Sequence, residues 1–213
     1  MSTQPPTPPG GPEGQQPTNV PGSFTQEIRH SNVSARVPEK VARGAFSTGA
    51  IVLQGQHEFL VDFVLRVAQP HQLVARVILP PAIMPSLIHT LRENLGHYQA
   101  RFGAPPALPT PPPGTPIPTI EEIYQALKYP DETLTGVYAN AVLITHTPSE
   151  FGFDFITSCY PRPVVSARVF LAAPQVPVLL NNLAVSFQQY QQKLAAARQQ
   201  QPPPGEPRPP AGG

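Results

Sequence analysis

The chain has 213 residues, 40% of them hydrophobic, with a formal net charge of +1 at pH 7 and one cysteine. Such a balance is not typical of dedicated nucleic-acid-binding proteins, and one cysteine excludes a disulfide framework or a multi-thiolate metal site. Because no apolar run reaches spanning length and the N-terminus is polar and Pro-rich, we expect a cytoplasmic protein with no membrane partner.

Proline divides the chain. Of its 32 prolines, 21 fall within residues 1–35, 103–118 and 202–213. These stretches have few apolar side chains to offset the entropy of ordering. We therefore expect disordered tails over residues 1–35 and 199–213, which act as flexible tethers or polyproline ligands, and a Pro-rich linker over residues 104–128.

The same segment occurs twice. Val37–Phe102 and Tyr129–Leu194 align without a gap at a constant offset of 92, and 15 of the 66 positions are identical. A repeat of this length indicates one supersecondary unit built twice. Each copy alone is near the size at which a core becomes marginal. We therefore predict two domains, over residues 36–103 and 129–198, that pack on each other as an intrachain pseudo-dimer.

The expected elements follow in the same order in both copies. Alternating, β-branched and aromatic runs predict strands, and apolar residues at helical spacing predict a helix that covers their apolar face. The predicted strands are residues 45–53, 58–67 and 73–79 in the first copy and 137–145, 150–159 and 165–171 in the second; the helices run from Pro85 to Phe102 and over Leu179–Leu194. The fold class is thus α+β, with two β-β-β-α units. Thr119 and Glu122 form a capping-box pattern that predicts a short linker helix over residues 119–127.

The outer face of each predicted sheet carries an ion pair. If the hairpins turn about Gln69 and Pro161, Asp62 lies opposite Arg76 and Asp154 opposite Arg168. The same register places Leu60 by Ile78 and Val64 by Val74. An ion pair flanked by apolar residues indicates a contact surface, for the other copy, another chain or a client, unless the tails or the linker helix cover it. The candidate interaction face comprises Leu60, Asp62, Val64, Arg76, Ile78, Asp154, Arg168 and Phe170.

A second group of residues is polar. Tyr138 and Asn140 open the second copy, and the H-T-P-S-E turn that follows its first strand could supply hydrogen-bond partners to the asparagine. A turn-stabilising network is the favoured interpretation, and a small-ligand site is the alternative. The candidate network comprises Tyr138, Asn140, His146, Ser149 and Glu150.

No pattern in the chain indicates catalysis, a metal site or a cofactor. Cys159 and His146 could suggest a thiol nucleophile, but the first copy has Val67 and Gln54 there, so the cysteine is interpreted as structural. The histidines are scattered, and carboxylates four apart on a strand lie about 13 Å apart, too far for paired acid–base work. We therefore expect a protein that is not an enzyme.

The string from Gly136 to Ile156 resembles the core motif of the bacterial domain-of-unknown-function family 3467. The second copy has the motif residues Tyr138, Asn140, His146, Ser149, Glu150, Phe151, Asp154 and Phe155. The first copy keeps Gly44, Phe46, Glu58, Phe59, Asp62 and Phe63 but has Thr48, Gln54 and His57 in place of the Asn, His and Ser. The resemblance implies a tandem duplication of that family's unit, and it implies no activity.

We expect a non-enzymatic protein-interaction or assembly module that binds a protein partner or itself. The element order is also similar to that of the export chaperone SecB, which implies a chaperone-like role with apolar client grooves. The alternative is a module that binds single-stranded nucleic acid through Arg29, Arg36, Lys40 and Arg43. Against it, the aromatic side chains fall on the core face and would not be free to stack on bases.

Overall fold

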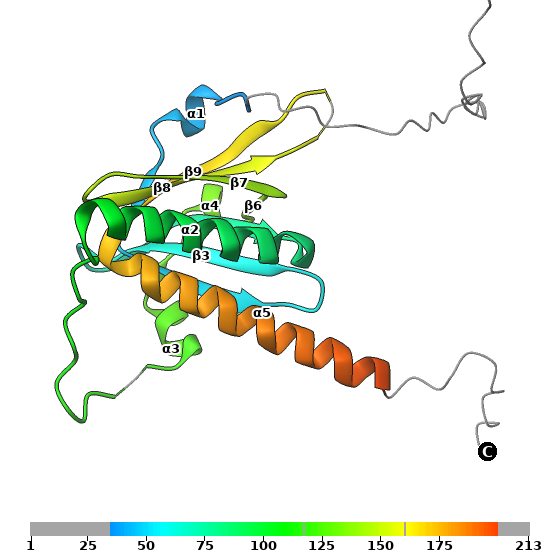
Figure 1. Cartoon of the computed structure of the whole chain (residues 1–213). Helices are drawn as coiled ribbons and strands as arrows, with labels where there is room; N and C mark the ends of the chain where they lie inside the picture. Colours follow the sequence, from blue (N-terminus) through cyan, green and yellow to red (C-terminus); the bar gives the residue numbers. More distant parts are fainter. Residues whose placement is uncertain (1–34, 117, 160, 200–213) are drawn as a thin grey trace, which may run out of the picture. The chain divides into compact units, whose positions relative to one another are not determined.

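The computed structural model describes residues 35–116, 118–159 and 161–199. The fold is α+β (Figure 1). The tails predicted to be disordered lie, apart from residues 35 and 199, outside the described residues. The elements of the first copy are α1 (Glu39–Ala42), β1 (Ala45–Ser47), β2 (Gly49–Gln54), β3 (Phe59–Leu65), β4 (His71–Leu79) and, after a 3₁₀ turn at Pro81–Ile83, α2 (Met84–Phe102). The linker and the second copy contain α3 (Ile120–Gln125), β5 (Leu127–Lys128), α4 (Asp131–Leu134), β6 (Val137–Tyr138), β7 (Ala141–His146), β8 (Glu150–Thr157), β9 (Val164–Ala172), a 3₁₀ turn at Ala173–Gln175 and α5 (Val176–Gln199).

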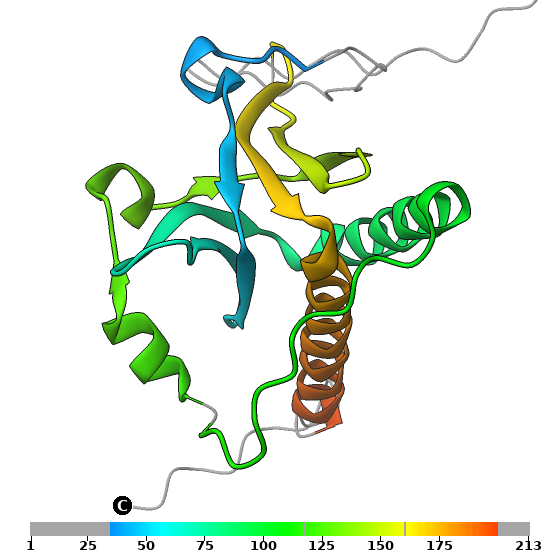
Figure 2. The ribbon, with the colours of Figure 1, turned by 90° about the vertical axis from the view of Figure 1, so that its left-hand side faces the viewer.

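Each predicted first strand is broken in two, which corrects the continuous strands expected over residues 45–53 and 137–145. The first piece crosses to the other copy: β1 pairs in parallel with β9, and β6 pairs in parallel with β4. Figure 2 shows β1 running beside β9. The second piece, β2 or β7, returns to the meander of its own copy. Each sheet therefore contains one strand from the opposite copy.

The hairpins keep most of the predicted register. Asp62 pairs with Arg76 and Leu60 with Ile78, as predicted, and Asp154 pairs with Arg168. The predicted pairing of Val64 with Val74 is wrong, because a β-bulge after Phe63 shifts Val64 opposite Leu73. The second copy has the same irregularity between Phe155 and Ile156. A bulge adds a residue to one strand only, so simple alternation misplaces every pair beyond it.

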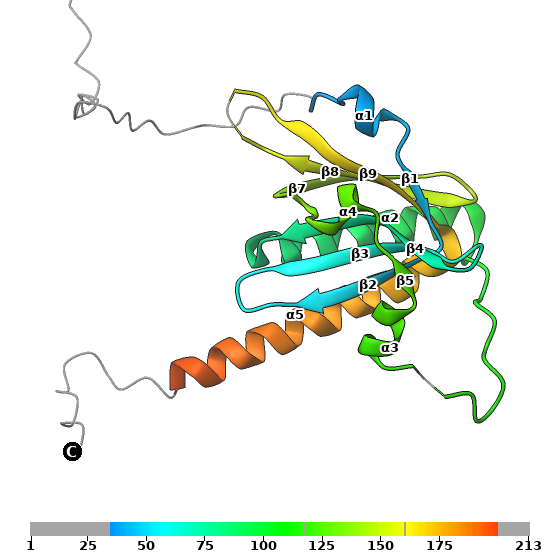
Figure 3. The same ribbon diagram turned by 180° about the vertical axis from the view of Figure 1, so that it is seen from behind.

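The two long helices lie on one side of the strands, in front of them in Figure 1 and behind them in Figure 3. They are exchanged between the copies: α2 packs along β7 and α5 packs along β2. The ring centroids of Tyr98 on α2 and Phe151 on β8 are 5.2 Å apart, and those of Tyr190 on α5 and Phe59 on β3 are 5.4 Å apart. The expectation that each helix covers the sheet of its own copy is thus incomplete. One apolar core contains residues from both copies.

The linker helix is shorter than predicted. The capping box is confirmed, since the Glu122 amide donates to the Thr119 hydroxyl and the Glu122 carboxylate accepts from the Thr119 amide. The helix ends at Gln125 instead of Leu127, because Leu127 and Lys128 form β5 beside the start of β4. Among the described helices, none combines the length and the apolar composition that crossing a membrane requires.

Candidate functional site

The ion pairs hold the exchanged segments in place. Arg76 donates from Nε and Nη2 to the Asp62 carboxylate at 2.8 and 2.7 Å, and its Nη1 donates to the Leu134 carbonyl of α4 at 3.1 Å. Arg168 likewise donates to Asp154 at 2.6 and 2.7 Å and to the Ala42 carbonyl of α1 at 3.2 Å. The bonds to these carboxylates raise the pKa of both arginines above its ordinary value. Each arginine thus ties its own sheet to the short helix of the other copy.

Two glycines permit this close approach, and sequence reasoning missed their role. Gly44 and Gly136 have φ of 67° and 70°, a region that favours glycine. A Cβ on Gly44 would lie 2.9 Å from Cγ of Arg168, and one on Gly136 would lie 2.7 Å from Cγ of Arg76. The available signal was their identity in both copies. Each glycine therefore fixes the place where a chain segment crosses the arginine of the opposite copy.

The outer face of the first sheet is covered by the linker. The Tyr124 hydroxyl of α3 donates to Oδ2 of Asp62 at 2.5 Å. Ile51, Val64 and Leu127 form a small apolar cluster against which Ile123 and Tyr124 pack. Within the candidate interaction face, Asp62 and Val64 are consequently buried, whereas Leu60, Arg76 and Ile78 are partly exposed. The linker helix is the cover that the sequence left as an alternative for this copy.

The matching face of the second sheet is more exposed. Leu143, at the place of Ile51, is 55% exposed, whereas Ile51 is 7% exposed. The Asp154 side chain is 17% exposed and that of Asp62 is 0%. On β1, Phe46 is 49% exposed beside its partner Phe170. We call this surface the open face; it comprises Phe46, Leu143, Asp154, Ile156, Arg168 and Phe170.

The candidate polar network is not one group. Asn140 accepts from the Ser158 amide at 2.7 Å, at the far end of β8, and not from the H-T-P-S-E turn as expected. His146 ends β7, about 20 Å from Asn140 by strand rise. In the first copy Thr48 accepts from the Arg66 amide at 2.8 Å, the equivalent bond. A hydroxyl and an amide thus perform the same structural task where the first strand breaks.

The remaining members stabilise the β7–β8 turn or line its surroundings. Glu150 accepts from the Thr147 hydroxyl at 2.8 Å, and the Ser149 carbonyl accepts from the Ala173 amide. His146 packs against Tyr98, Phe102 and Phe151, and burial lowers its pKa. The Tyr138 side chain is exposed on β6. Because Asn140, His146 and Glu150 are not gathered, they do not form a common ligand site.

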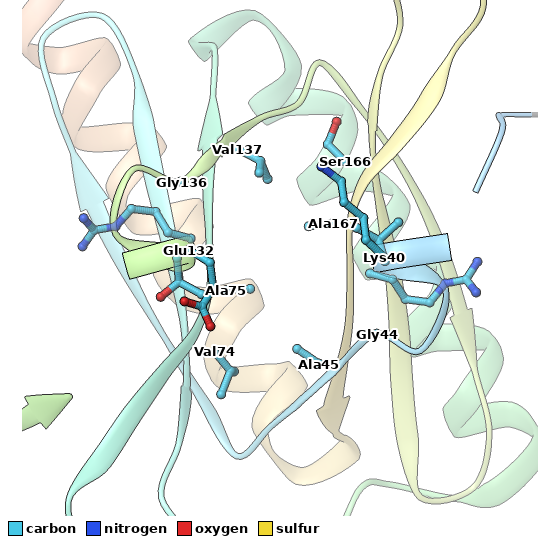
Figure 4. A pocket seen from close by; sticks show the side chains of 14 residues that line it. Lys40, Gly44, Ala45, Val74, Ala75, Glu132, Gly136, Val137, Ser166 and Ala167 are labelled. Atoms are coloured by element: carbon cyan, nitrogen blue, oxygen red, sulfur yellow. The ribbon is translucent and has the colours of Figure 1, made fainter. Parts of the chain in front are cut away.

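A cavity of about 430 Å³ lies where the copies meet (Figure 4). Its 14 lining residues form seven pairs at the repeat offset of 92, so both copies contribute the same positions to it. Lys40 and Glu132, which are one such pair, lie on opposite sides of it in Figure 4. The guanidinium groups of Arg76 and Arg168 are already bonded to carboxylates. The cavity is therefore interpreted as part of the interface between the two copies.

The structure also shows where the cysteine and the core phenylalanines lie. Cys159, interpreted as a structural residue at the end of a strand, lies beyond β8 and is exposed. The core phenylalanines on β3 and β8 are buried, as the pattern predicted, and cannot stack on bases; they are Phe59, Phe63, Phe151 and Phe155. In the described residues, no three His, Cys, Asp or Glu side chains are grouped so that they could hold a metal ion.

Tyr124 is expected to make the protein sensitive to alkali. Burial, and then its bond to Asp62, raise the pKa of Tyr124 above its ordinary value of about 10. Because the folded state holds this proton more tightly, its contribution to stability is complete below pH 10 and is lost as pH rises above that value. Urea titrations from pH 9 to pH 12 should show a smaller loss for Tyr124→Phe than for the unsubstituted chain. Tyr138→Phe, at an exposed ring, should keep the original slope; identical slopes in all three chains would contradict the assignment.

Comparison with known proteins supports the family. The model of the family described as "Protein of unknown function (DUF3467)" matches residues 9–122 and again residues 115–197. A search of curated proteins and a search of solved structures gave no match. The two matches together span most of the chain, and their order agrees with a tandem duplication. The chain belongs to the DUF3467 family.

Proposed function

We propose that the chain is a non-enzymatic protein-interaction module that binds an apolar segment of a partner protein on the open face. The observation that carries the proposal is the difference between two related faces. On the first sheet α3 covers Ile51 and Asp62, whereas the equivalent Leu143 and Asp154 of the second sheet remain exposed. An exposed apolar residue beside a charge pair, on a face equivalent by the repeat to the one that α3 covers, supports a docking role.

The sequence that precedes the first copy lacks the side chains that cover the first sheet. At the places of Ile123, Tyr124 and Leu127, 92 positions earlier, the sequence has Ser31, Asn32 and Ala35. These smaller or more polar side chains offer less apolar area than those of the linker. Both copies thus carry the receiving face, whereas the covering side chains are found in the linker and not at the equivalent positions before the first copy.

The charge of the open face favours a protein over a nucleic acid. Asp154 and Arg168 neutralise each other through two hydrogen bonds. A phosphate that approached Arg168 would have to displace the Asp154 carboxylate, whose negative charge would repel the phosphate. The apolar neighbours Leu143 and Phe170 instead match an apolar protein segment.

The proposal is tested by the protein's capacity to hold an unfolded client. We expect the full chain in molar excess to slow the aggregation of reduced insulin B chain, followed by light scattering, and Leu143→Glu to abolish most of the effect. Val185→Glu introduces the same charge at an exposed apolar residue of α5 and should leave the effect intact. Equal loss in both variants, or no protection by the unsubstituted chain, would contradict the proposal. So would a dimer that Leu143→Glu dissociates, since the occupant would then be a second copy.

A further inference from the structure

The first sheet shows what kind of segment its face accepts. The segment is one short helix followed by an extended residue pair, α3 and β5. Ile123 and Tyr124 pack against the cluster of Ile51 and Val64, and the Tyr124 hydroxyl reaches the Asp62 carboxylate. Two features therefore define the fit: an aliphatic side chain over the apolar residues, and beside it a phenol hydroxyl that donates to the carboxylate.

The second sheet presents the same receiving groups. Leu143 pairs with Asp154 as Ile51 pairs with Asp62, and Asp154 pairs with Arg168 as Asp62 pairs with Arg76. Arg168 bonds to both carboxylate oxygens of Asp154. Each carboxylate oxygen can accept more than one hydrogen bond, so Oδ2 keeps capacity for a further donor, as Oδ2 of Asp62 shows.

An extended residue pairs with the edge of the second sheet, as β5 pairs with the edge of the first sheet. Arg36 forms a parallel β-bridge with Val164. The Arg36 amide donates to the Pro163 carbonyl at 2.9 Å, and the Arg36 carbonyl accepts from the Val165 amide at 2.9 Å. In the first sheet Lys128 of β5 pairs with Gln72 at the equivalent place. Ala35, the residue before Arg36, occupies the position that corresponds to Leu127 in the repeat. Ala35 therefore supplies less apolar area at this place than Leu127 supplies in the first sheet.

We infer that the partner of the open face is an amphipathic helical segment that places a tyrosine hydroxyl on Asp154 and aliphatic side chains on Leu143 and Ile156. This inference rests on the proposed function and names the chemistry of the partner at the same face. Leucine and isoleucine supply the apolar area, whereas the hydroxyl makes a charge-assisted hydrogen bond that selects tyrosine over phenylalanine. An acidic side chain in place of the tyrosine is disfavoured, because its carboxylate would oppose that of Asp154.

The probe is the chain's own linker segment offered as a peptide. A fluorescent peptide with the sequence of residues 119–130 (TIEEIYQALKYP) is titrated with the full chain and followed by fluorescence anisotropy. We expect saturable binding that weakens at least tenfold with Leu143→Glu and is unchanged with Val185→Glu. The Tyr124→Phe version of the peptide should bind about tenfold more weakly to the unsubstituted chain. With Asp154→Asn, the two peptides should differ by less than twofold.

The outcomes separate this inference from the proposed function. If both peptides bind equally to the unsubstituted chain and Leu143→Glu weakens both, the face binds helices but the tyrosine selection is wrong. If neither peptide binds while the chain still protects insulin B chain through Leu143, the inference fails and the proposed function stands. If Asp154→Asn lowers the thermal midpoint so far that binding cannot be measured, the comparison of the two peptides on the unsubstituted chain and on Leu143→Glu decides the question.

Discussion

Gly44→Ala and Gly136→Ala are each expected to lower the free energy of unfolding by about 3 kcal/mol, from backbone strain together with overpacking. Both residues have positive φ, which an alanine adopts at a cost. The added methyl of Gly44→Ala would also lie 2.5 Å from Cε2 of Phe170, and that of Gly136→Ala 2.7 Å from Cγ of Arg76. Denaturation in guanidinium chloride, followed by far-UV circular dichroism, measures the effect.

Gly96→Ala is the matched control for these two substitutions. Gly96 lies within α2, and a Cβ there would meet no atom within 4 Å. We expect this variant to gain about 0.5–1 kcal/mol, since alanine is the better helix former. If all three variants unfolded at the same denaturant concentration, the crossing of each glycine over the opposite arginine would not be important for stability.

The register of the sheets could be predicted because charge and alternation agree. Placing Asp62 opposite Arg76 requires only a turn position and a two-residue period, and both are local. The shift of Val64 could not be predicted, because a bulge leaves the composition of its strand unchanged. The break in the first strand was missed for a similar reason. Residues 45–53 are mostly β-type, and Gly49 beside the break is a weak local signal; the pairing of β1 with β9 of the second sheet explains why β1 leaves its own copy.

Sequence similarity between the two copies was an incomplete guide to the structural roles of equivalent residues. Thr48 and Asn140 differ in type, yet both accept a backbone amide at the end of the neighbouring strand. Ile51 and Leu143 look equivalent, yet one is buried and the other exposed. The difference arises from Tyr124, which lies 62 residues from Asp62 in the chain. A contact of that separation has no local pattern, so the cover could be suspected from the linker helix but not assigned to one sheet.

Asp62→Ala is expected to lower the free energy of unfolding by about 4 kcal/mol, within the range found when one partner of a buried pair is removed. Asp62 is fully buried and accepts three hydrogen bonds, two from Arg76 and one from Tyr124. Its loss leaves a guanidinium and a phenol facing an apolar cluster without their acceptor. We also expect α3 to detach, which hydrogen exchange of the α3 amides would show as a loss of protection.

Asp154→Ala provides the comparison within the same molecule. Its partner Arg168 is 26% exposed and can be hydrated when the carboxylate is removed, so we expect a loss of about 1 kcal/mol. The difference between the two variants measures what the cover adds to an otherwise identical ion pair. Equal losses would mean that both faces are equally shielded in solution, and the open face would then not be available to a partner. A large loss for Asp62→Ala alone would instead place the stability of the fold on the covered face and leave the open face free for binding.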